Sequence, residues 1–187
     1  IAALKNQINP HLIFNTLNAI YGMAIKERAL KTGNSLLRFS SLMRYLMEDE
    51  GHQKVALEKE LSYIDHYIQL QKLRTSERNA ITFDFSGSVE GLLIAPMILL
   101  PFVENAFKYG INPDFPSKID ISIDVIAGKL QMVVKNDVVN LKLESYELSG
   151  IGMKNTYKRL ELIYPGNHTL EFVKSDKSYQ VTLNINL

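Results

Sequence analysis

The sequence predicts an α+β protein, in which a helical hairpin precedes a mainly antiparallel sheet covered on one face by about three helices. Apolar residues recur at helical spacing over residues 1–50 and again over 57–75. From residue 81 onward they alternate with polar residues, which is typical of half-buried strands. Two more helical segments, 96–109 and 152–164, separate the alternating runs, so helices and strands are mixed in the second part of the chain.

The first of two predicted domains, residues 1–53, is the helical hairpin. A break is predicted at residues 32–35, because Gly33 suits the position after a helix end and Asn34 or Ser35 suits a helix start. Two antiparallel helices bury only one seam, so we expect a second copy of the chain to complete a four-helix bundle. The apolar positions at helical spacing are Ile13, Leu17, Ile20 and Ala24, then Leu36, Phe39, Met43 and Leu46.

The second predicted domain, residues 54–187, begins with a short connector and the helix over 57–75. Its strands are predicted from period-two alternation, and a turn at Ala127-Gly128 joins two of them. The alternating runs are 81–85, 119–125, 130–134 and 181–187.

Composition limits the classes of function. Hydrophobic residues make up 46% of the 187 residues, so the chain can form a core. The 21 basic and 20 acidic residues leave a net charge of +1, which disfavours nucleic-acid binding. The absence of cysteine excludes disulfides. The longest apolar stretch, 91–103, is too short to span a bilayer, and we expect membrane segments only upstream of Ile1.

A histidine near the start of the hairpin is a candidate phosphoryl acceptor. Imidazole is nucleophilic and substantially neutral near pH 7, which suits this chemistry. The alternative is that Asn9 caps the helix, Pro10 occupies its first turn and the histidine is an ordinary surface residue; spacing alone favours this alternative. At 100° per residue, one face opposite the apolar stripe carries His11, Phe14, Asn15 and Asn18.

Residues 101–110 predict a helix with polar groups on one side. Glu104, Asn105 and Lys108 lie within about one turn. A carboxylate, an amide oxygen and a lysine suit Mg²⁺ and phosphate. An intrahelical ion pair between Glu104 and Lys108 is the alternative, although it leaves the amide of Asn105 without a packing role.

A Gly-x-Gly turn, Gly150 to Gly152, runs into the helix over 152–164. Backbone N–H groups at such a helix start can bind phosphate. The alternative is a glycine-rich turn before an amphipathic helix, since this motif alone is weak.

Three segments together resemble one known family. Residues 7–18, around Asn9-Pro10-His11, closely resemble the phosphoacceptor motif of LytS-type sensor histidine kinases. Residues 101–110 and 149–160 resemble the N box and the second glycine box of the GHKL ATPase superfamily. The segment 55–74, which includes Glu60, is similar to the family's linking helix. The resemblance covers nearly the whole chain and implies a GHKL (Bergerat) α/β sandwich after the hairpin.

The resemblance also implies roles for individual residues. His11 would be the acceptor, with Pro10 and Asn15 as its neighbours. In the ATP-binding domain, Asn105 would ligate Mg²⁺ and Glu104 would be a base or part of the Mg²⁺ shell. The implied contacts with the nucleotide are Lys108 to phosphate, and Gly150 and Gly152 at the base of the ATP lid.

One segment departs from the superfamily pattern. Most members carry Asp-x-Gly-x-Gly, whose Asp binds the adenine amino group, whereas residues 134–139 here have no glycine. Asn136 stands where that Asp would be, and its amide oxygen can accept from the amine without charge assistance. The lid, about residues 138–149, is also short.

By resemblance, the chain is the cytoplasmic portion of an inner-membrane sensor. It would act as a homodimer that uses ATP and Mg²⁺ to phosphorylate His11, then pass the phosphoryl group to an aspartate of a LytTR-type response regulator. Two alternatives stay open from the residues. One is a degenerate nucleotide-binding or dimeric signalling module without transfer, and the other is a GHKL-type serine kinase or ATPase.

Overall fold

The computed structural model describes residues 9–48, 53–139 and 151–187. The chain divides into two compact units, Ile1–Gly51 and His52–Leu187, which are described separately here. The functions assigned to the two predicted domains, 1–53 and 54–187, stay predictions. Within the described ranges, none of the helices combines the length and the hydrophobicity that a membrane span requires.

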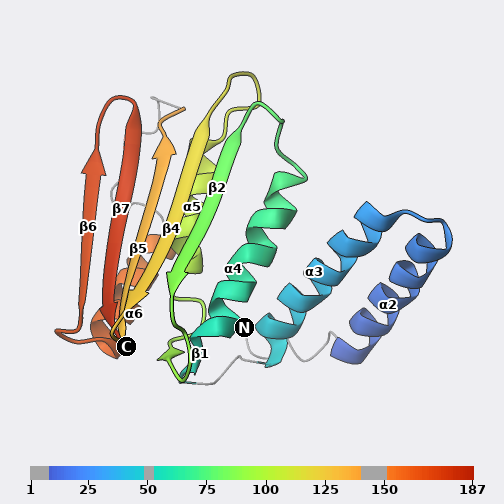
Figure 1. Cartoon of the computed structure of the whole chain (residues 1–187), viewed down its shortest axis with the longest axis horizontal. Helices are drawn as coiled ribbons and strands as arrows, with labels where there is room; N and C mark the ends of the chain where they lie inside the picture. Colours follow the sequence, from blue (N-terminus) through green and yellow to red (C-terminus); the bar gives the residue numbers. More distant parts are fainter. Residues whose placement is uncertain (1–8, 49–52, 140–150) are drawn as a thin grey trace. The chain divides into compact units, whose positions relative to one another are not determined.

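The first unit is a hairpin of helices α2 (Pro10–Lys26) and α3 (Leu30–Glu48) (Figure 1). Asn9 caps α2, because its side-chain oxygen accepts a hydrogen bond from the backbone N–H of His11 at 3.0 Å. Pro10 occupies the first helical position, where its missing N–H costs nothing. The predicted cap and the predicted place of the proline are therefore confirmed.

The predicted break at residues 32–35 is wrong. The first helix ends earlier, at Lys26 with Glu27 as its C-cap, and Arg28 takes a left-handed conformation with φ 57°. The backbone N–H of Arg28 donates a hydrogen bond to the carbonyl of Ile25 at 3.0 Å, and that of Ala29 donates to the carbonyl of Ala24 at 2.8 Å. These bonds close the helix end in the pattern that usually has a glycine in the left-handed position. Gly33 instead lies buried inside α3, where a Cβ would be 3.3 Å from Cδ1 of Ile25. The glycine therefore lets the two helices approach closely.

The second unit is a five-stranded sheet with helices α4 (Leu57–Lys72), α5 (Leu100–Gly110) and α6 (Ile151–Ile163) packed on one face (Figure 1). Only the pair β2–β4 is parallel, so the predicted mainly antiparallel sheet is confirmed. A short ribbon of β1 (Val55–Ala56) and β3 (Leu93–Ile94) lies beside it. In order across the sheet, the strands are β2 (Ala80–Gly87), β4 (Lys118–Ile126), β5 (Lys129–Asp137), β7 (Ser178–Asn186) and β6 (His168–Lys174).

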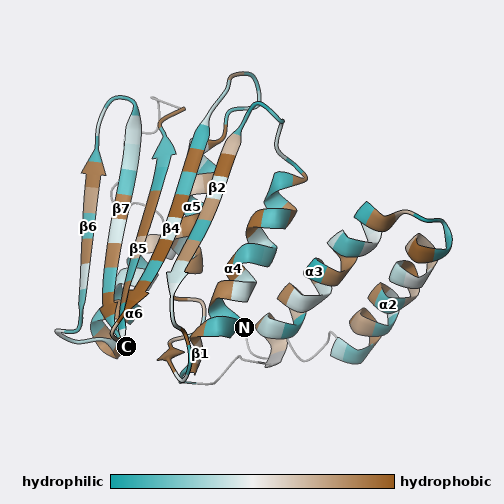
Figure 2. Ribbon diagram, viewed as in Figure 1, coloured by the Kyte–Doolittle hydropathy of each residue, from teal (hydrophilic) through white to brown (hydrophobic). Residues whose placement is uncertain are grey.

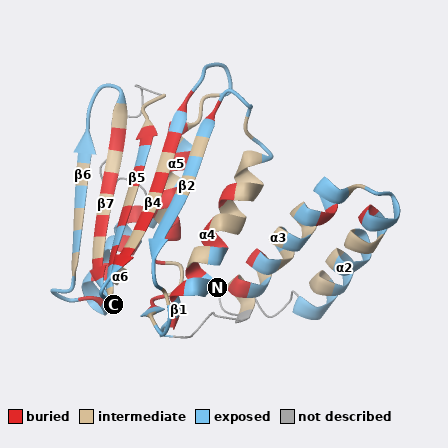
Figure 3. Cartoon of the chain, in the orientation of Figure 1, coloured by how far each residue is buried: buried red, intermediate tan, exposed pale blue. Residues whose placement is uncertain are grey.

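The core of this unit follows from the period of the strands. Hydrophobic and hydrophilic residues alternate along the sheet (Figure 2), and buried positions alternate with them along β4, β5 and β7 (Figure 3). Successive side chains of a strand point to opposite faces, so one face packs on the helices and the other stays polar. The buried hydrophobic residues of these three strands are Ile119, Ile121, Ile123, Val125, Leu130, Met132, Val134, Tyr179, Val181, Leu183 and Ile185.

The helix predicted over 96–109 begins later than expected, at Leu100. Met97 has a left-handed backbone with φ 55°, which is incompatible with a helix through that position. The segment 95–99 is thus a turn between β3 and α5, and side chains from other elements hold it in place, as described below.

The turn between β4 and β5 generates a test of the fold. Ala127 and Gly128 form a two-residue loop with φ 50° and 76°, between the paired residues Ile126 and Lys129. Both values are positive, as in the hairpin turn that favours Asn-Gly. Ala127→Asn should raise the free energy of unfolding by about 0.5–1 kcal/mol, because asparagine tolerates this conformation better than alanine. Urea unfolding measures the change; Ala127→Val should lower stability, and an asparagine variant less stable than the parent would contradict the turn.

Candidate functional site

His11 lies at the surface of α2, one residue after Pro10. The amide nitrogen of Asn15 lies 3.1 Å from Nδ1 and 3.4 Å from Nε2 of the imidazole. A ring contacted on one side by an amide and exposed elsewhere can be reached by a second reactant. The structure thus places Asn15, a predicted neighbour, directly against the predicted acceptor.

Phe14 does not share the exposed face predicted for it. It is half-buried, and the guanidinium carbon of Arg44, on α3, lies 4.7 Å from the centre of its ring. The buried seam of α2 is therefore rotated toward Phe14, and Ile20, predicted inside, is 42% exposed. Arg44 thus contacts a residue that lies about one turn of α2 from His11. Sequence patterns could not reveal Arg44, because residues 14 and 44 are far apart in the chain.

Helix α5 presents the second group of predicted residues. Pro101 fits the first turn, and the apolar face of the helix packs onto β4 and β5. Glu104 and Lys108 are exposed and Asn105 is half-buried, so all three lie off the buried face. The buried residues are Leu100, Phe102, Val103, Ala106 and Phe107.

The alternative of an ion pair within α5 is not realised. Glu104 and Lys108 both lie in the described part of the chain and form no ion pair with each other. The ammonium of Lys108 instead lies 4.8 Å from the centre of the Tyr109 ring. The carboxylate and the ammonium are therefore not neutralised by one another, and each can interact with a ligand.

Two tyrosines of α4 lie beside Glu104. Burial raises the pKa of Tyr63 to about 12, and the negative charge of Glu104 contributes to the increase. Burial and, to a smaller extent, the negative charge of Glu104 also raise the pKa of Tyr67 to about 12. Desolvation in turn raises the pKa of the Glu104 carboxyl above its ordinary value. A carboxyl with a raised pKa is a better proton acceptor than an ordinary surface glutamate.

Asn136 is a polar residue at the end of an apolar row. It follows Met132 and Val134 on the core-facing side of β5 and is only 2% exposed. Its Nδ2 donates a hydrogen bond to the carbonyl of Asp137 at 2.8 Å. A polar group in a row of core residues carries a desolvation cost, which favours a role in binding over a role in packing.

The C-terminal end of α5 rests directly on Asn136. A Cβ on Gly110 would lie 2.6 Å from the Cβ of Asn136, which is closer than real Cβ atoms approach. Glycine at this position therefore allows the helix that carries Asn105 and Lys108 to meet the predicted adenine-binding residue. The structure therefore brings the end of α5 against Asn136, a residue of a different predicted site segment.

The glycine motif is described only in part. Gly150 and residues 140–149 of the predicted lid lie outside the described residues. Gly152 lies in the first turn of α6, where its carbonyl accepts a hydrogen bond from the hydroxyl of Thr156 at 3.0 Å. A Cβ on Gly152 would touch no described atom, so packing does not require glycine there.

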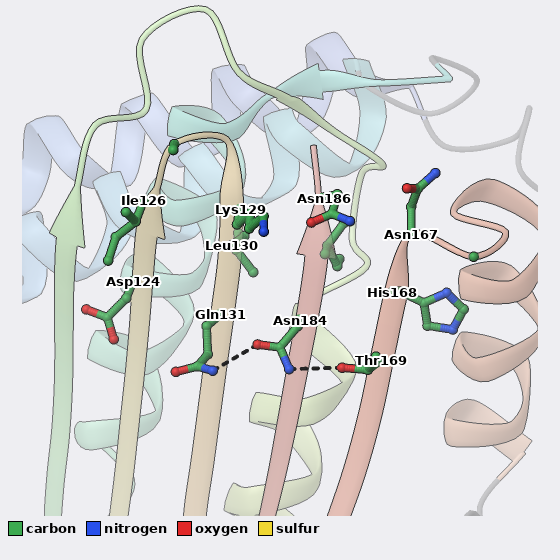
Figure 4. A pocket seen from close by; sticks show the side chains of 13 residues that line it. Asp124, Ile126, Lys129, Leu130, Gln131, Asn167, His168, Thr169, Asn184 and Asn186 are labelled. Carbon is green, nitrogen blue, oxygen red and sulfur yellow. Dashed lines mark hydrogen bonds between the residues drawn. The ribbon is translucent and has the colours of Figure 1, made fainter.

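A surface hollow of about 630 Å³ lies elsewhere, at the end of β5 opposite Asn136 (Figure 4). Gln131 donates to Asn184, and Asn184 donates to Thr169, both at 2.9 Å. These side chains therefore hydrogen-bond to one another along the open face of the sheet. The hollow contains no predicted site residue, and we assign it no part in the chemistry.

The described residues suit a metal ion bound jointly by the protein and a nucleotide better than a metal ion bound by protein ligands alone. Among them, no cluster of three or more histidine, cysteine, aspartate or glutamate side chains could hold an ion. Mg²⁺ takes hard oxygen ligands and usually keeps substrate phosphates and water in its shell. The amide of Asn105 beside the carboxylate of Glu104 matches that small protein contribution.

Comparison with known proteins confirms the resemblance. Residues 1–79 match the family model described as histidine kinase. The sensor histidine kinase YpdA of Escherichia coli K12 is 27% identical over 88% of this chain and 30% of its own length. The sensor protein LytS of Staphylococcus saprophyticus is 24% identical over 99% of this chain and 33% of its own length. The chain thus spans about a third of the curated relatives it matches.

The fold is also that of histidine kinases. The histidine kinase domain of the blue-light activated kinase EL346 from Erythrobacter litoralis has a TM-score of 0.56 to this chain at 10% identity. The likeness covers 96% of this chain and 86% of that domain. The predicted α+β fold of the GHKL class is therefore confirmed.

The contact between Gly110 and Asn136 generates a test. Gly110→Ala should lower the free energy of unfolding by about 1–3 kcal/mol, because the added methyl group overpacks a tight contact. Gly152→Ala is the matched control, a helical glycine with open space, and should be neutral or gain up to about 1 kcal/mol. Urea unfolding of both variants measures the difference. Equal stability of the two would contradict the close approach of α5 to Asn136.

Proposed function

We propose that the chain phosphorylates His11 from Mg-ATP and passes the phosphoryl group to an aspartate of a response regulator. The proposal is supported by its similarity in sequence to LytS-type sensor proteins and in fold to histidine kinases. In this proposal residues 54–187 are the catalytic domain, and residues 1–53 carry the acceptor and the dimer contact. The observation that carries it is the contact of α5 with Asn136, which supports one nucleotide site shared by the N-box helix and β5.

The first step needs a neutral imidazole and a positioned phosphate. A lone pair on a ring nitrogen of His11 attacks the γ-phosphorus, an N–P bond forms, the bond to the β–γ bridging oxygen breaks, and ADP leaves. Once the N–P bond has formed, the proton on the other ring nitrogen of His11 can pass to a base or to water. Asn15 restricts the rotation of the ring and so lowers the entropy cost of attack.

The nucleotide contacts follow from the residues that α5 and β5 present. Asn105 would supply an amide oxygen to Mg²⁺, and Lys108 would contact a phosphate. The Mg²⁺ ion, when bound, neutralises phosphate charge. The amide oxygen of Asn136 would accept from the adenine amine, and Gly150 and Gly152 would form the base of the lid.

The partners of the proposed kinase follow from its hairpin. Among the described residues of α2 and α3, seven large apolar side chains are exposed: Leu12, Ile20, Met23, Ile25, Leu30, Leu37 and Phe39, at 65, 42, 59, 42, 64, 44 and 43%. Burial of such residues against a second copy supports a homodimer with a four-helix bundle. We further propose a LytTR-type regulator as the receiver, and a cytoplasmic location on an inner-membrane protein anchored by segments outside this chain.

Asn136 motivates a second candidate function, a degenerate module that dimerises without transferring phosphate. Its Nδ2 is bonded internally and its side chain carries no charge to assist adenine binding. A thermal shift assay separates the two candidates. A stabilised protein at millimolar Mg-ATP supports the kinase, and an unchanged Tm supports the module.

Removal of the acceptor tests the kinase proposal directly. His11→Gln should abolish acid-labile labelling by Mg-ATP while ATP binding persists, because glutamine cannot form the phosphoramidate. His66→Gln replaces another imidazole and should label within twofold of the parent. Labelling with radioactive ATP, before and after acid, gives the measurement, and a chelator should suppress it in the parent. Undiminished labelling of His11→Gln would contradict the proposal.

The raised pKa of Glu104 generates a pH test. A proton acceptor must be ionised, and desolvation keeps this carboxyl protonated above its usual pKa of 4.5. The rate of His11 labelling should therefore rise as pH increases through the raised pKa, and Glu104→Gln should lose that rise and about 10²-fold in rate. Single-turnover labelling of the parent and of Glu104→Gln across a range of pH gives the two rate profiles. All other titrating groups are shared, so a difference in shape reports on Glu104. Profiles of identical shape would exclude Glu104 as a base.

A further inference from the structure

The turn that precedes α5 is held by side chains from two other helices. Glu60, on α4, accepts hydrogen bonds from the backbone N–H of Met97 at 2.8 Å and of Leu99 at 3.2 Å. The hydroxyl of Tyr164, just after α6, accepts from the N–H of Ala95 at 2.8 Å. These contacts come from segments 37 to 69 residues away in the chain. We call residues 95–99 the entry turn of α5.

The carbonyl groups of the entry turn are also engaged. Arg159, on α6, donates from Nη2 to the carbonyl oxygen of Pro96 at 2.8 Å. The N-cap residue, Leu99, offers no side chain that could cap the helix. The backbone groups at the start of α5 therefore depend on partners supplied by α4 and α6.

The burial of Glu60 is the unusual feature. Its side chain is 0% exposed, and a buried carboxylate is costly unless several hydrogen bonds compensate it. Its negative charge lies at the N-terminal end of α5, where the helix dipole stabilises it. An apolar residue would fill the space at less cost but would leave two backbone N–H groups unpaired.

The entry turn is strained, and the side chains around it account for its persistence. Met97 has φ 55°, a conformation that residues other than glycine rarely adopt. Such strain persists where surrounding contacts over-determine the backbone, and it is often found at functional sites. Bonds to Glu60, Tyr164 and Arg159 supply that constraint around a single residue.

Helix α4 follows α5 beyond the entry turn. Tyr67 contacts Phe107 edge-on, with ring centres 5.9 Å apart. Since Glu60 meets the start of α5 and Tyr67 meets its later part, the two helices run side by side in the same direction. A shift of the entry turn would therefore displace the whole of α5 along α4, and with it Asn105 and Lys108.

We infer that Glu60 is a positioning residue of the proposed kinase, which fixes where α5 begins and so places Asn105 and Lys108 at the phosphates of the nucleotide. The inference rests on the proposed function. In this role Glu60 makes no contact with ATP. Its effect on the reaction passes through the two amides it binds and through the helix that they precede.

The experiment compares Glu60→Gln with Glu58→Gln, a change at an exposed glutamate in the same turn of α4. Glutamine keeps the shape but can accept through one oxygen only, so one amide of the entry turn loses its acceptor. The apparent KM for ATP in His11 labelling should rise at least tenfold in Glu60→Gln and stay within twofold in Glu58→Gln. The rate at saturating ATP should fall by a smaller factor, a split that general loss of folded protein would not produce.

A second variant covers the case in which Glu60→Gln does not fold. Tyr164→Phe removes only the acceptor of the Ala95 N–H and should raise the KM for ATP about threefold, in line with the loss of one hydrogen bond. A folded Glu60→Gln with a KM within twofold of the parent would overturn the inference. An unfolded Glu60→Gln together with an unchanged KM in Tyr164→Phe would do the same.

Amide hydrogen exchange separates this inference from the proposed function. In protein without nucleotide, exchange of the α5 amides should be at least tenfold faster in Glu60→Gln than in Glu58→Gln. If the parent chain neither binds nor uses ATP, the proposed function fails, and so does a positioning role in it. Faster exchange in Glu60→Gln would still show that Glu60 holds α5 in place. Unchanged exchange would overturn the structural basis of the inference.

Discussion

Burial of one face of α5 against β4 and β5 is the constraint on which the rest of the second unit depends. A helix that packs on a sheet commits its apolar side to the core, and periodicity then decides which residues stay outside. Here the apolar side takes Phe102, Val103 and Ala106, which leaves Glu104 and Lys108 outside. The sheet fixes the helix laterally, and the contact of Gly110 with Asn136 fixes its far end.

Elements with a long, regular period could be predicted from the sequence, and elements defined by single turns could not. Strands β4, β5 and β7 alternate over nine residues each, which leaves little ambiguity. The break predicted at Gly33 is wrong because the left-handed residue that ends the helix is Arg28, which is not a glycine and carries no local signal for a helix end. Strand β6, at the edge of the sheet, is shorter and only partly buried, so its alternation is weak.

In the candidate site too, the features that are local in the sequence could be predicted and the contacts between distant segments could not. His11, Glu104, Asn105 and Lys108 carry chemistry that can be recognised locally, and a family resemblance adds to it. The supports of these residues are contacts between distant segments, such as Arg44 on Phe14 and Glu60 on the entry turn. A single sequence carries no signal for such contacts, because each partner has a plausible local role of its own. Geometry is what reveals them.

The tight fit of Asn136 under the end of α5 limits how this site can change. Asparagine and aspartate differ in charge but hardly in shape, so the space beneath Gly110 admits either, whereas a longer side chain would have to displace the helix. At the proposed adenine position, an exchange between acid and amide would thus change the electrostatics with little change in shape. In the proposed kinase, one substitution here would adjust nucleotide affinity without rebuilding the surrounding core.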